Sequence, residues 1–196
     1  MVPPKLRRSR LATLPRLRIE RGANSSEPAG IMMEAEPVRL RDSYRSDFES
    51  MWELDQDCFP RGISYSKSEL RAFLSQKTAE TIVAEREGRL VAFVLGSRRN
   101  RTNGHVITLD VAAAARRQGV GRQLMVELER RFRAAGVKQV QLESAVTNMV
   151  AIAFYQRLGY RMVAHLANYY GPGLHAWKME KALDGTANPQ QEPRIS

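Results

Sequence analysis

The stretch ARRQGVGRQLMVELERRF, residues 115–132, constrains the fold more than any other part of the chain. Apolar residues recur every four positions along it, the spacing of a buried stripe on an amphipathic helix: Val120, Leu124, Leu128 and Phe132. Gly119 and Gly121 stand at the start of this helix, although glycine costs a helix about 1 kcal/mol relative to alanine. The glycine pair therefore indicates a backbone that needs room or an unusual conformation.

The surroundings of the glycines predict an anion-binding loop. The apolar strand HVITLDV, residues 105–111, precedes them, and the first turn of the following helix leaves backbone N–H groups without partners at its positive dipole end. Arg116, Arg117 and Arg122 add positive charge. The loop lacks the Lys-Ser/Thr ending of a P-loop and the third glycine of a dinucleotide fingerprint. It is interpreted as a cradle for a pyrophosphate; the alternative is a glycine-containing turn with solvated arginines.

Hydrophobic periodicity and turn residues divide the rest of the chain into elements. Strands are expected at 37–41, in a hairpin over 81–97 turning at Glu87 and Gly88, and at 105–111, 137–144, 160–167 and 175–183. Helices are expected at 46–59, at 66–76, from Val120 to Gly136, and at 148–159. The second of these is expected to begin with a capping residue, Ser66. The resulting order, β α α β β β α β α β β, predicts an α/β fold in which a mixed sheet carries helices on its faces.

Length and charge predict one basic domain with two tails. The 196 residues suit a single core, and the formal net charge is +10. Residues 1–30 hold seven basic and two acidic residues, prolines and no sustained period, so residues 1–31 are expected to be a disordered basic tail that contacts nucleic acid or the ribosome weakly. An organelle-targeting peptide, or a translation start at Met32 or Met33, are the alternatives. Residues 184–196 are expected to form a second disordered tail.

The single cysteine, Cys58, excludes an internal disulfide framework and a cysteine metal cluster, which fits the reducing cytoplasm. The three histidines are too scattered for metal-ligand spacing, so no metal is expected. No apolar run approaches the roughly 18 residues that span a bilayer, and no membrane contact is expected. A cytoplasmic protein is the resulting expectation.

The strand HVITLDV, the motif RRQGVG, the helix after it and the later stretch VQLESAVTNMVAIAFYQRLGYRMV together resemble the GNAT superfamily of acetyl-CoA-dependent N-acetyltransferases. The resemblance runs from about His105 to Leu183, and the domain is expected to span residues 32–183. Within the superfamily the chain is most similar to the ribosomal-protein alanine N-acetyltransferases. The resemblance implies a central, mixed, mostly antiparallel sheet flanked by helices, with acetyl-CoA as co-substrate and a peptide or protein N-terminus as acceptor.

The resemblance also implies where acetyl-CoA binds. The backbone of Leu109, Asp110 and Val111 would hold the pantetheine arm and the acetyl carbonyl. Asn148 would hydrogen-bond the cofactor. The pyrophosphate would lie on the following residues, with Arg122 beside them: Arg116, Arg117, Gln118, Gly119, Val120 and Gly121.

Acetyl transfer to an amine needs a proton acceptor for the amine and a proton donor for the departing thiolate. Glu143 is the candidate base, directly or through water, because it ends a strand beside the cofactor and matches the family position; the alternative is an exposed carboxylate paired with an arginine. Tyr155, two helical turns after Asn148 on one face, is the candidate acid; the alternative is a core tyrosine with a satisfied hydroxyl. Tyr169 and Tyr170 either line the groove for the peptide or pack as ordinary strand residues.

The favoured function is therefore transfer of an acetyl group from acetyl-CoA to a primary amine, foremost the α-amine of a protein such as a ribosomal protein. The same fold serves several kinds of acceptor, so a small-molecule or lysine amine is the alternative acceptor. A non-catalytic module that binds acyl-CoA or nucleic acid is the alternative from a different class.

Overall fold

The computed structural model describes residues 36–60 and 62–184. The two expected tails, 1–31 and 184–196, lie outside these residues except for Asp184, so the predictions made for them stay predictions.

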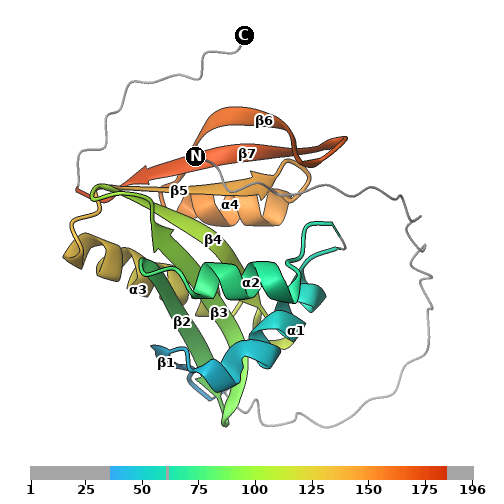
Figure 1. Ribbon diagram of the computed structural model, residues 1–196, viewed down its shortest axis with the longest axis vertical. Coiled ribbons are helices and arrows are strands. Elements are labelled where there is room, and N and C mark those ends of the chain that lie inside the picture. The colour runs from blue at the N-terminus through green and yellow to red at the C-terminus, as the bar shows by residue number, and fades with distance from the viewer. Residues whose placement is uncertain (1–35, 61, 185–196) are drawn as a thin grey trace, which may run out of the picture.

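A seven-stranded sheet forms the centre of the described chain (Figure 1). Its strands lie in the order β1-β2-β3-β4-β5-β7-β6. Their bounds are β1 Arg39–Asp42, β2 Ala79–Arg86, β3 Arg89–Arg98, β4 Asn103–Val111, β5 Gln139–Ala145, β6 Arg161–Gly171 and β7 Leu174–Ala182. Neighbouring strands pair antiparallel except β4 and β5, which are parallel. The prediction of a mixed, mostly antiparallel sheet is confirmed.

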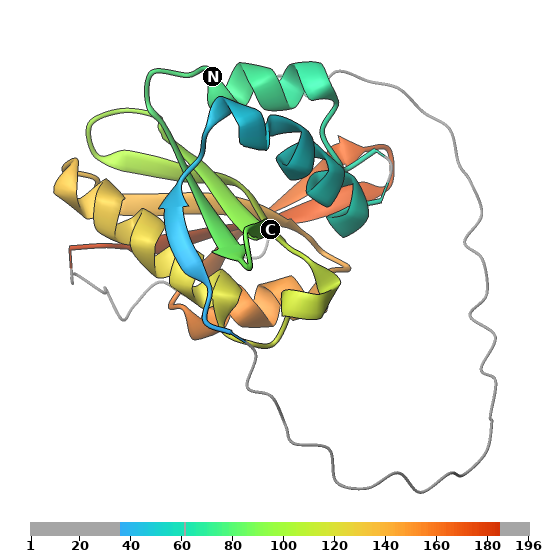
Figure 2. The same cartoon turned by 90° about the horizontal axis from the view of Figure 1, so that it is seen from below.

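Helices cover both faces of this sheet. They are α1 Phe48–Cys58, α2 Lys67–Leu74, α3 Val120–Ala134 and α4 Met149–Arg157, with short 3-10 turns η1 Arg45–Asp47 and η2 Ala113–Ala115. Figure 2 shows α1 and α2 on one face and α3 and α4 on the other. The order of strands and helices therefore follows the predicted one, and α2 begins with the predicted capping residue, since Ser66 accepts from the backbone N–H of Glu69.

The core lies in two layers, one on each side of the sheet. The predicted stripe on α3 is buried, and Leu124, Leu128 and Phe132 are completely inaccessible. The glycines opposite this helix are required by its packing, because a Cβ atom on Gly104 would lie 2.7 Å from the Phe132 ring and one on Gly96 would lie 2.8 Å from it. This close contact presses α3 onto β3 and β4 and so fixes where its N-terminus lies.

Strands β4 and β5 separate along their length, which opens the sheet. Their pairing covers only Asn103–His105 and Gln139–Gln141, although both strands continue beyond it (Figure 1). The pairing of β3 with β4 shifts at the same place, because Leu95 pairs with Thr108 and Gly96 with Val106, which leaves Ile107 as an extra residue. An extra residue of this kind bends and twists a strand. The second half of β4 therefore turns away from β5.

Candidate active site

The start of α3 is built for an anion. Gly119 caps the helix with a φ of +80°, a left-handed conformation that favours glycine. Apart from its chain neighbours, no described residue has a heavy atom within 4 Å of the place where its Cβ would be. A Cβ on Gly121 would meet its neighbours only at ordinary contact distances of 3.5 Å or more. Packing within the chain therefore does not require a glycine at 121. The missing side chains leave open the first turn of α3, where N–H groups have no partner within the helix.

The arginines expected beside this turn differ in what they contact. Arg117 and Arg122 are exposed. Arg116 donates from Nε to the backbone oxygen of Val111 over 2.9 Å, so part of its hydrogen-bonding capacity holds the loop to the end of β4. Gln118 is also occupied, since its side chain donates to the Ala114 oxygen over 2.7 Å. The loop thus presents backbone N–H groups and guanidinium charge, which is the donor set that a pyrophosphate fits.

The predicted pantetheine segment lies at the separated end of β4. Leu109, Asp110 and Val111 pair with β3 on one side, and among the described residues β5 does not pair with them on the other. Backbone groups on that side are therefore available to an extended ligand. The side chains of Leu109 and Val111 lie near Gly121 of α3, whereas the Asp110 side chain is completely buried.

Glu143, on β5, is held by hydrogen bonds from two side chains. His105 Nε2 lies 2.7 Å from its Oε2, and the Tyr169 hydroxyl donates to the same oxygen over 3.0 Å. The Glu143 side chain is 8% exposed, so it is not on the surface, and none of the arginines that the structure describes forms an ion pair with it. Burial raises the pKa of Glu143, but the hydrogen bonds from His105 and Tyr169 and the nearby charges more than offset it, and the pKa lies below its ordinary value.

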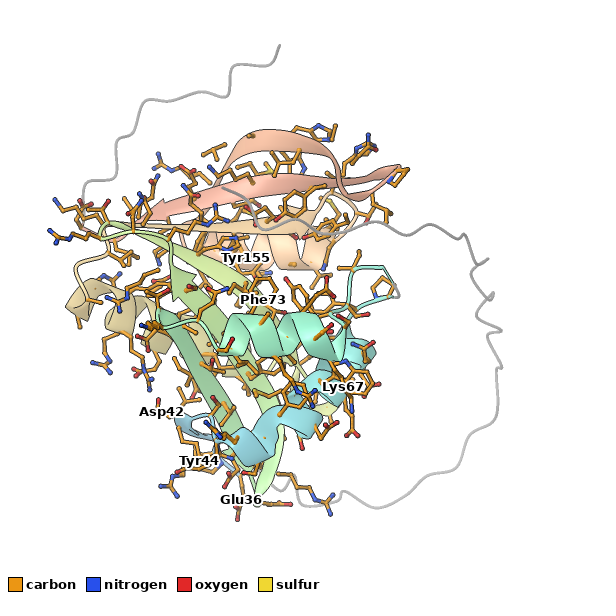
Figure 3. All side chains as sticks on the ribbon, in the orientation of Figure 1. Glu36, Asp42, Tyr44, Lys67, Phe73 and Tyr155 are labelled. Atoms are coloured by element: carbon orange, nitrogen blue, oxygen red, sulfur yellow. The ribbon has the colours of Figure 1, made fainter. Side chains whose placement is uncertain are left out.

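Tyr155 lies on α4, and its hydroxyl forms no hydrogen bond with the residues that the structure describes. Its ring contacts those of Phe154 and Tyr160 edge to face, with centroids 5.1 and 5.7 Å apart. Within the described residues the Tyr155 hydroxyl has no hydrogen-bond partner, unlike the satisfied hydroxyl of the alternative interpretation. Burial and the nearby Asp110 raise its pKa, so the phenol keeps its proton. Figure 3 shows Tyr155 near the middle of the molecule, above Phe73 of α2.

Tyr169 and Tyr170, on β6, lie next to Glu143. Their rings pack edge to face with centroids 4.9 Å apart, and the Tyr170 hydroxyl donates to the backbone oxygen of Glu143 over 3.2 Å. Tyr65, between α1 and α2, reaches β4 where it separates from β5, because its hydroxyl donates to the backbone oxygen of Ile107 over 3.2 Å. The hydroxyls of Tyr169 and Tyr170 therefore bind Glu143, and that of Tyr65 binds β4, at the opening between β4 and β5.

Asn148 stands at the start of α4, where the sequence predicts that a helix begins. It caps α4, with Oδ1 accepting from the Ala151 N–H over 3.1 Å. The side chain is exposed, and its amide nitrogen remains as the group that would donate to a cofactor.

Sequence reasoning missed two residues of this site, His105 and Tyr65. His105 was interpreted only as a scattered histidine, yet in the parallel pair it lies opposite Gln141, two residues before Glu143. The pairing of β4 with β5 would have revealed the contact, but the order of strands in the sheet is not visible in a periodic pattern. Tyr65 lies in a loop whose path is set by Asp55, which accepts from its backbone N–H over 2.7 Å.

Within residues 36–60 and 62–184, no three side chains of the types that bind metals are grouped closely enough to hold an ion. None of the helices that the structure describes has both the length and the apolar composition needed to cross a membrane.

Comparison with known proteins identifies this arrangement. Residues 48–160 match the model of the acetyltransferase (GNAT) family. The chain is 33% identical over 151 residues to an uncharacterized N-acetyltransferase of Methanocaldococcus jannaschii, covering 76% of this chain and 95% of that protein. It is 26% identical over 157 residues to an N-alpha-acetyltransferase of Sulfurisphaera tokodaii, and this match covers 74% of this chain and 93% of that protein.

Among solved structures, the ribosomal-protein-S18-alanine N-acetyltransferase of Escherichia coli superposes with a TM-score of 0.69 over 80% of this chain and 100% of that one. Its sequence identity is 19%, so this likeness concerns the fold. The chain belongs to the GNAT family and is an N-acetyltransferase that uses acetyl-CoA.

Proposed function

We propose that the enzyme acetylates the α-amino group of a protein or peptide N-terminus in the cytoplasm, with ribosomal proteins among its acceptors. The observation that carries the proposal is that the hydroxyls of Tyr169 and Tyr170 both donate to Glu143, at the opening between β4 and β5. The N-alpha-acetyltransferase of Sulfurisphaera tokodaii, alike over most of both chains, supports this acceptor class. Contact of residues 1–31 with a ribosome or nucleic acid stays a prediction.

Residues at the end of β4, at the start of α3 and at the start of α4 bind different parts of acetyl-CoA. Leu109, Asp110 and Val111 offer backbone groups to the pantetheine arm and the acetyl carbonyl. The loop and first turn of α3 offer the pyrophosphate site, and the Asn148 amide nitrogen adds a donor. When bound, acetyl-CoA supplies the acetyl group as a thioester, an activated acyl donor.

Glu143 is the proposed base. Because its pKa is lowered, it is ionised at neutral pH and accepts a proton weakly. An α-amine with a pKa near 8 requires less of a base than a lysine amine with a pKa of about 10.4. This electrostatic setting supports an N-terminal acceptor over a lysine. His105 holds the carboxylate in place, and Tyr155, with a free and protonated hydroxyl, is the proposed donor to the departing thiolate.

The acceptor class is tested by measuring CoA release with a panel of acceptors: peptides with free N-termini, including ribosomal-protein N-termini, matched peptides with a blocked N-terminus and an internal lysine, polyamines and aminoglycosides. We expect turnover with the free N-termini. Turnover with polyamines or aminoglycosides and none with the peptides would contradict the proposal.

The cofactor site is tested separately, by thermal melting with and without acetyl-CoA. A ligand at a hundredfold excess over its Kd stabilises the folded state by about 2.7 kcal/mol. We expect this stabilisation for the wild type but not for Gly121→Glu, whose carboxylate would occupy the open first turn of α3. Val126→Glu adds the same charge on the exposed face of α3 and should respond like the wild type. An equal response of Gly121→Glu would place the pyrophosphate elsewhere.

A further inference from the structure

The residues of β6 that reach Glu143 lie in a bulge of the strand. In the pairing of β6 with β7, residues 167–170 of β6 lie opposite a single residue of β7, His175. We call residues 167–170 the β6 bulge. β7 separates β6 from β5 in the sheet (Figure 1), and yet Tyr169 and Tyr170 hydrogen-bond to Glu143 of β5. The bulge therefore carries both tyrosines past β7 to the proposed base.

His175 holds this bulge through a hydrogen bond in which its side chain is the acceptor. The backbone N–H of Asn168 donates to Nδ1 of His175 over 3.1 Å. A backbone N–H can only donate, so Nδ1 carries no proton, and the imidazole is neutral with its proton on Nε2. The bond joins the one residue of β7 opposite the bulge to the middle of the bulge itself.

The backbone of Asn168 adopts a conformation that needs such support. Its φ is +53°, in the left-handed region that asparagine enters more readily than most residues but that is still unfavourable. The Asn168 Oδ1 accepts from the Gly173 N–H over 2.8 Å, so His175 and the turn between β6 and β7 both hold this residue. Tyr169 follows directly in the chain, and its direction depends on that conformation.

Protonation of His175 would remove its bond to Asn168. An imidazolium carries a proton on each nitrogen and accepts from neither, so two N–H groups would face each other over 3.1 Å. Histidine is the side chain whose charge ordinarily changes between about pH 5 and pH 8. The contact that holds the bulge is therefore one that mild acid breaks.

Few ionisable groups lie near the His175 ring. Neighbouring ionisable side chains come from β5, β6 and β7: Glu143, His165, Tyr169, Tyr170 and Lys178. The His165 ring contacts that of His175, with centroids 5.3 Å apart. Lys178 pairs with Glu143, and both lie on the opposite face of the sheet, because side chains alternate along a strand. Residues 146–154, which lead from β5 into α4, include no ionisable side chain.

We propose that His175 is a positioning residue for the acceptor, an inference that rests on the function proposed above. Its neutral imidazole holds Asn168 and thereby keeps Tyr169 and Tyr170 on Glu143. The imidazolium releases Asn168, so in acid the bulge and its tyrosines leave the base. The role requires a hydrogen-bond acceptor at the position of Nδ1, and it does not require a ring.

The first test compares two replacements of His175 in the full-length enzyme at about pH 8, where histidine is ordinarily neutral. His175→Asn keeps an acceptor, because its Oδ1 is as many bonds from the backbone as Nδ1, and it does not titrate. His175→Phe keeps a ring without the acceptor. With an acceptor peptide, kcat/KM should fall about 100-fold in His175→Phe and stay near the wild-type value in His175→Asn. The Kd of acetyl-CoA should be the same in all three proteins, which also shows that each is folded.

The second test is the ratio of the wild-type kcat/KM to that of His175→Asn as a function of pH. Protonation of the α-amine and of Glu143 occurs in both proteins, so the ratio isolates His175. It should be near one at about pH 8 and fall as pH decreases toward about 5. His165→Asn is the matched control, since it removes the neighbouring imidazole and keeps the acceptor on His175, and it should follow the wild type. A constant ratio would overturn the inference.

The third test needs neither acetyl-CoA nor turnover. The backbone amide signal of Asn168 in nuclear magnetic resonance spectra reports on the hydrogen bond to Nδ1. In the wild type this signal should shift between about pH 8 and pH 5, and in His175→Asn it should stay in place. A wild-type signal that does not respond to pH would show that His175 does not hold the bulge.

The outcomes separate this inference from the proposed function. Peptide turnover by the wild type, together with an unchanged kcat/KM in His175→Phe, would overturn the inference alone, and so would equal losses in His175→Phe and His175→Asn. Absence of wild-type turnover on every peptide would overturn the proposed function and the inference with it. Loss in His175→Phe, rescue in His175→Asn and an unchanged Kd for acetyl-CoA would support both.

Discussion

The Glu143 carboxylate forms hydrogen bonds with the side chains of His105 and Tyr169, and these contacts determine the effects expected when it is replaced. Glu143→Gln keeps the shape of the side chain but removes the proton acceptor, so kcat should fall about 100-fold. The Kd of acetyl-CoA should not change, because the side chain faces His105 and Tyr169. Steady-state kinetics with an acceptor peptide and calorimetric titration of acetyl-CoA measure the two effects. Glu53→Gln, exposed on α1, is the control, and a kcat equal to that of the wild type would rule Glu143 out as the base.

His105 sets the pH range in which Glu143 is ionised. His105→Ala removes a hydrogen bond that lowers the pKa of Glu143, so that pKa should rise toward its ordinary value. A base with a higher pKa becomes protonated at a higher pH on acidification. Below the pKa of the α-amine, the pH at which kcat/KM begins to fall more steeply, because Glu143 also becomes protonated, should therefore be higher in the variant.

The same change has a consequence for stability. A carboxyl with a lowered pKa contributes stability above its unfolded pKa of about 4.3 and loses that contribution as pH falls through the folded pKa. The wild type should thus exceed His105→Ala in stability most clearly at neutral pH, and the difference should shrink in acid. Urea unfolding at several pH values measures it. If the steeper fall of kcat/KM began at the same pH in both proteins, His105 would not act on the base.

At the scale of elements, α3 is joined to β7 by a buried ion pair. Lys181 Nζ lies 2.6 Å from Glu129 Oε2, and the Glu129 side chain is 4% exposed. Arg133 lies farther away, at 3.7 Å from the same oxygen. Lys181→Met leaves the Glu129 charge buried with this weaker partner, and losing one partner of a buried pair costs about 3 kcal/mol.

The measurement is the free energy of unfolding in urea. The double variant Glu129→Leu, Lys181→Met removes both charges and should recover most of the loss, because the penalty lies in the uncompensated charge. No loss in the single variant would show that solvent or Arg133 already compensates Glu129.

At the scale of the whole molecule, the proposed chemistry is confined to the described domain. The proposed site residues lie between Tyr65 and His175, and residues 1–31 contribute none of them. Deleting residues 1–31 should therefore leave kcat and KM with a peptide acceptor unchanged. It should also abolish any binding to nucleic acid, which in the full chain would weaken steeply with salt. A large loss of kcat on deletion would show that the first residues belong to the acceptor site.

Several features of the fold were readable in the sequence because they depend on local periodicity and backbone geometry. The stripe from Val120 to Phe132, the capping by Ser66 and the glycine at 119 each act within a few residues, and the structure has them where they were predicted. The order of elements followed from the same local patterns. The resemblance to a family then directed attention to Glu143 and Tyr155, which no local pattern distinguishes from other acidic and aromatic residues.

The tertiary structure alone decided which side chains meet. His105 meets Glu143 because β4 and β5 pair in parallel up to His105, and the extra residue Ile107 then turns β4 away from β5. The packed structure also buries Asp110 completely, although aspartate is a residue type that is rarely buried. Periodicity determines which face of a strand or helix a residue occupies. The pKa of a carboxyl depends instead on groups tens of residues away, and only the packed sheet sets their distances.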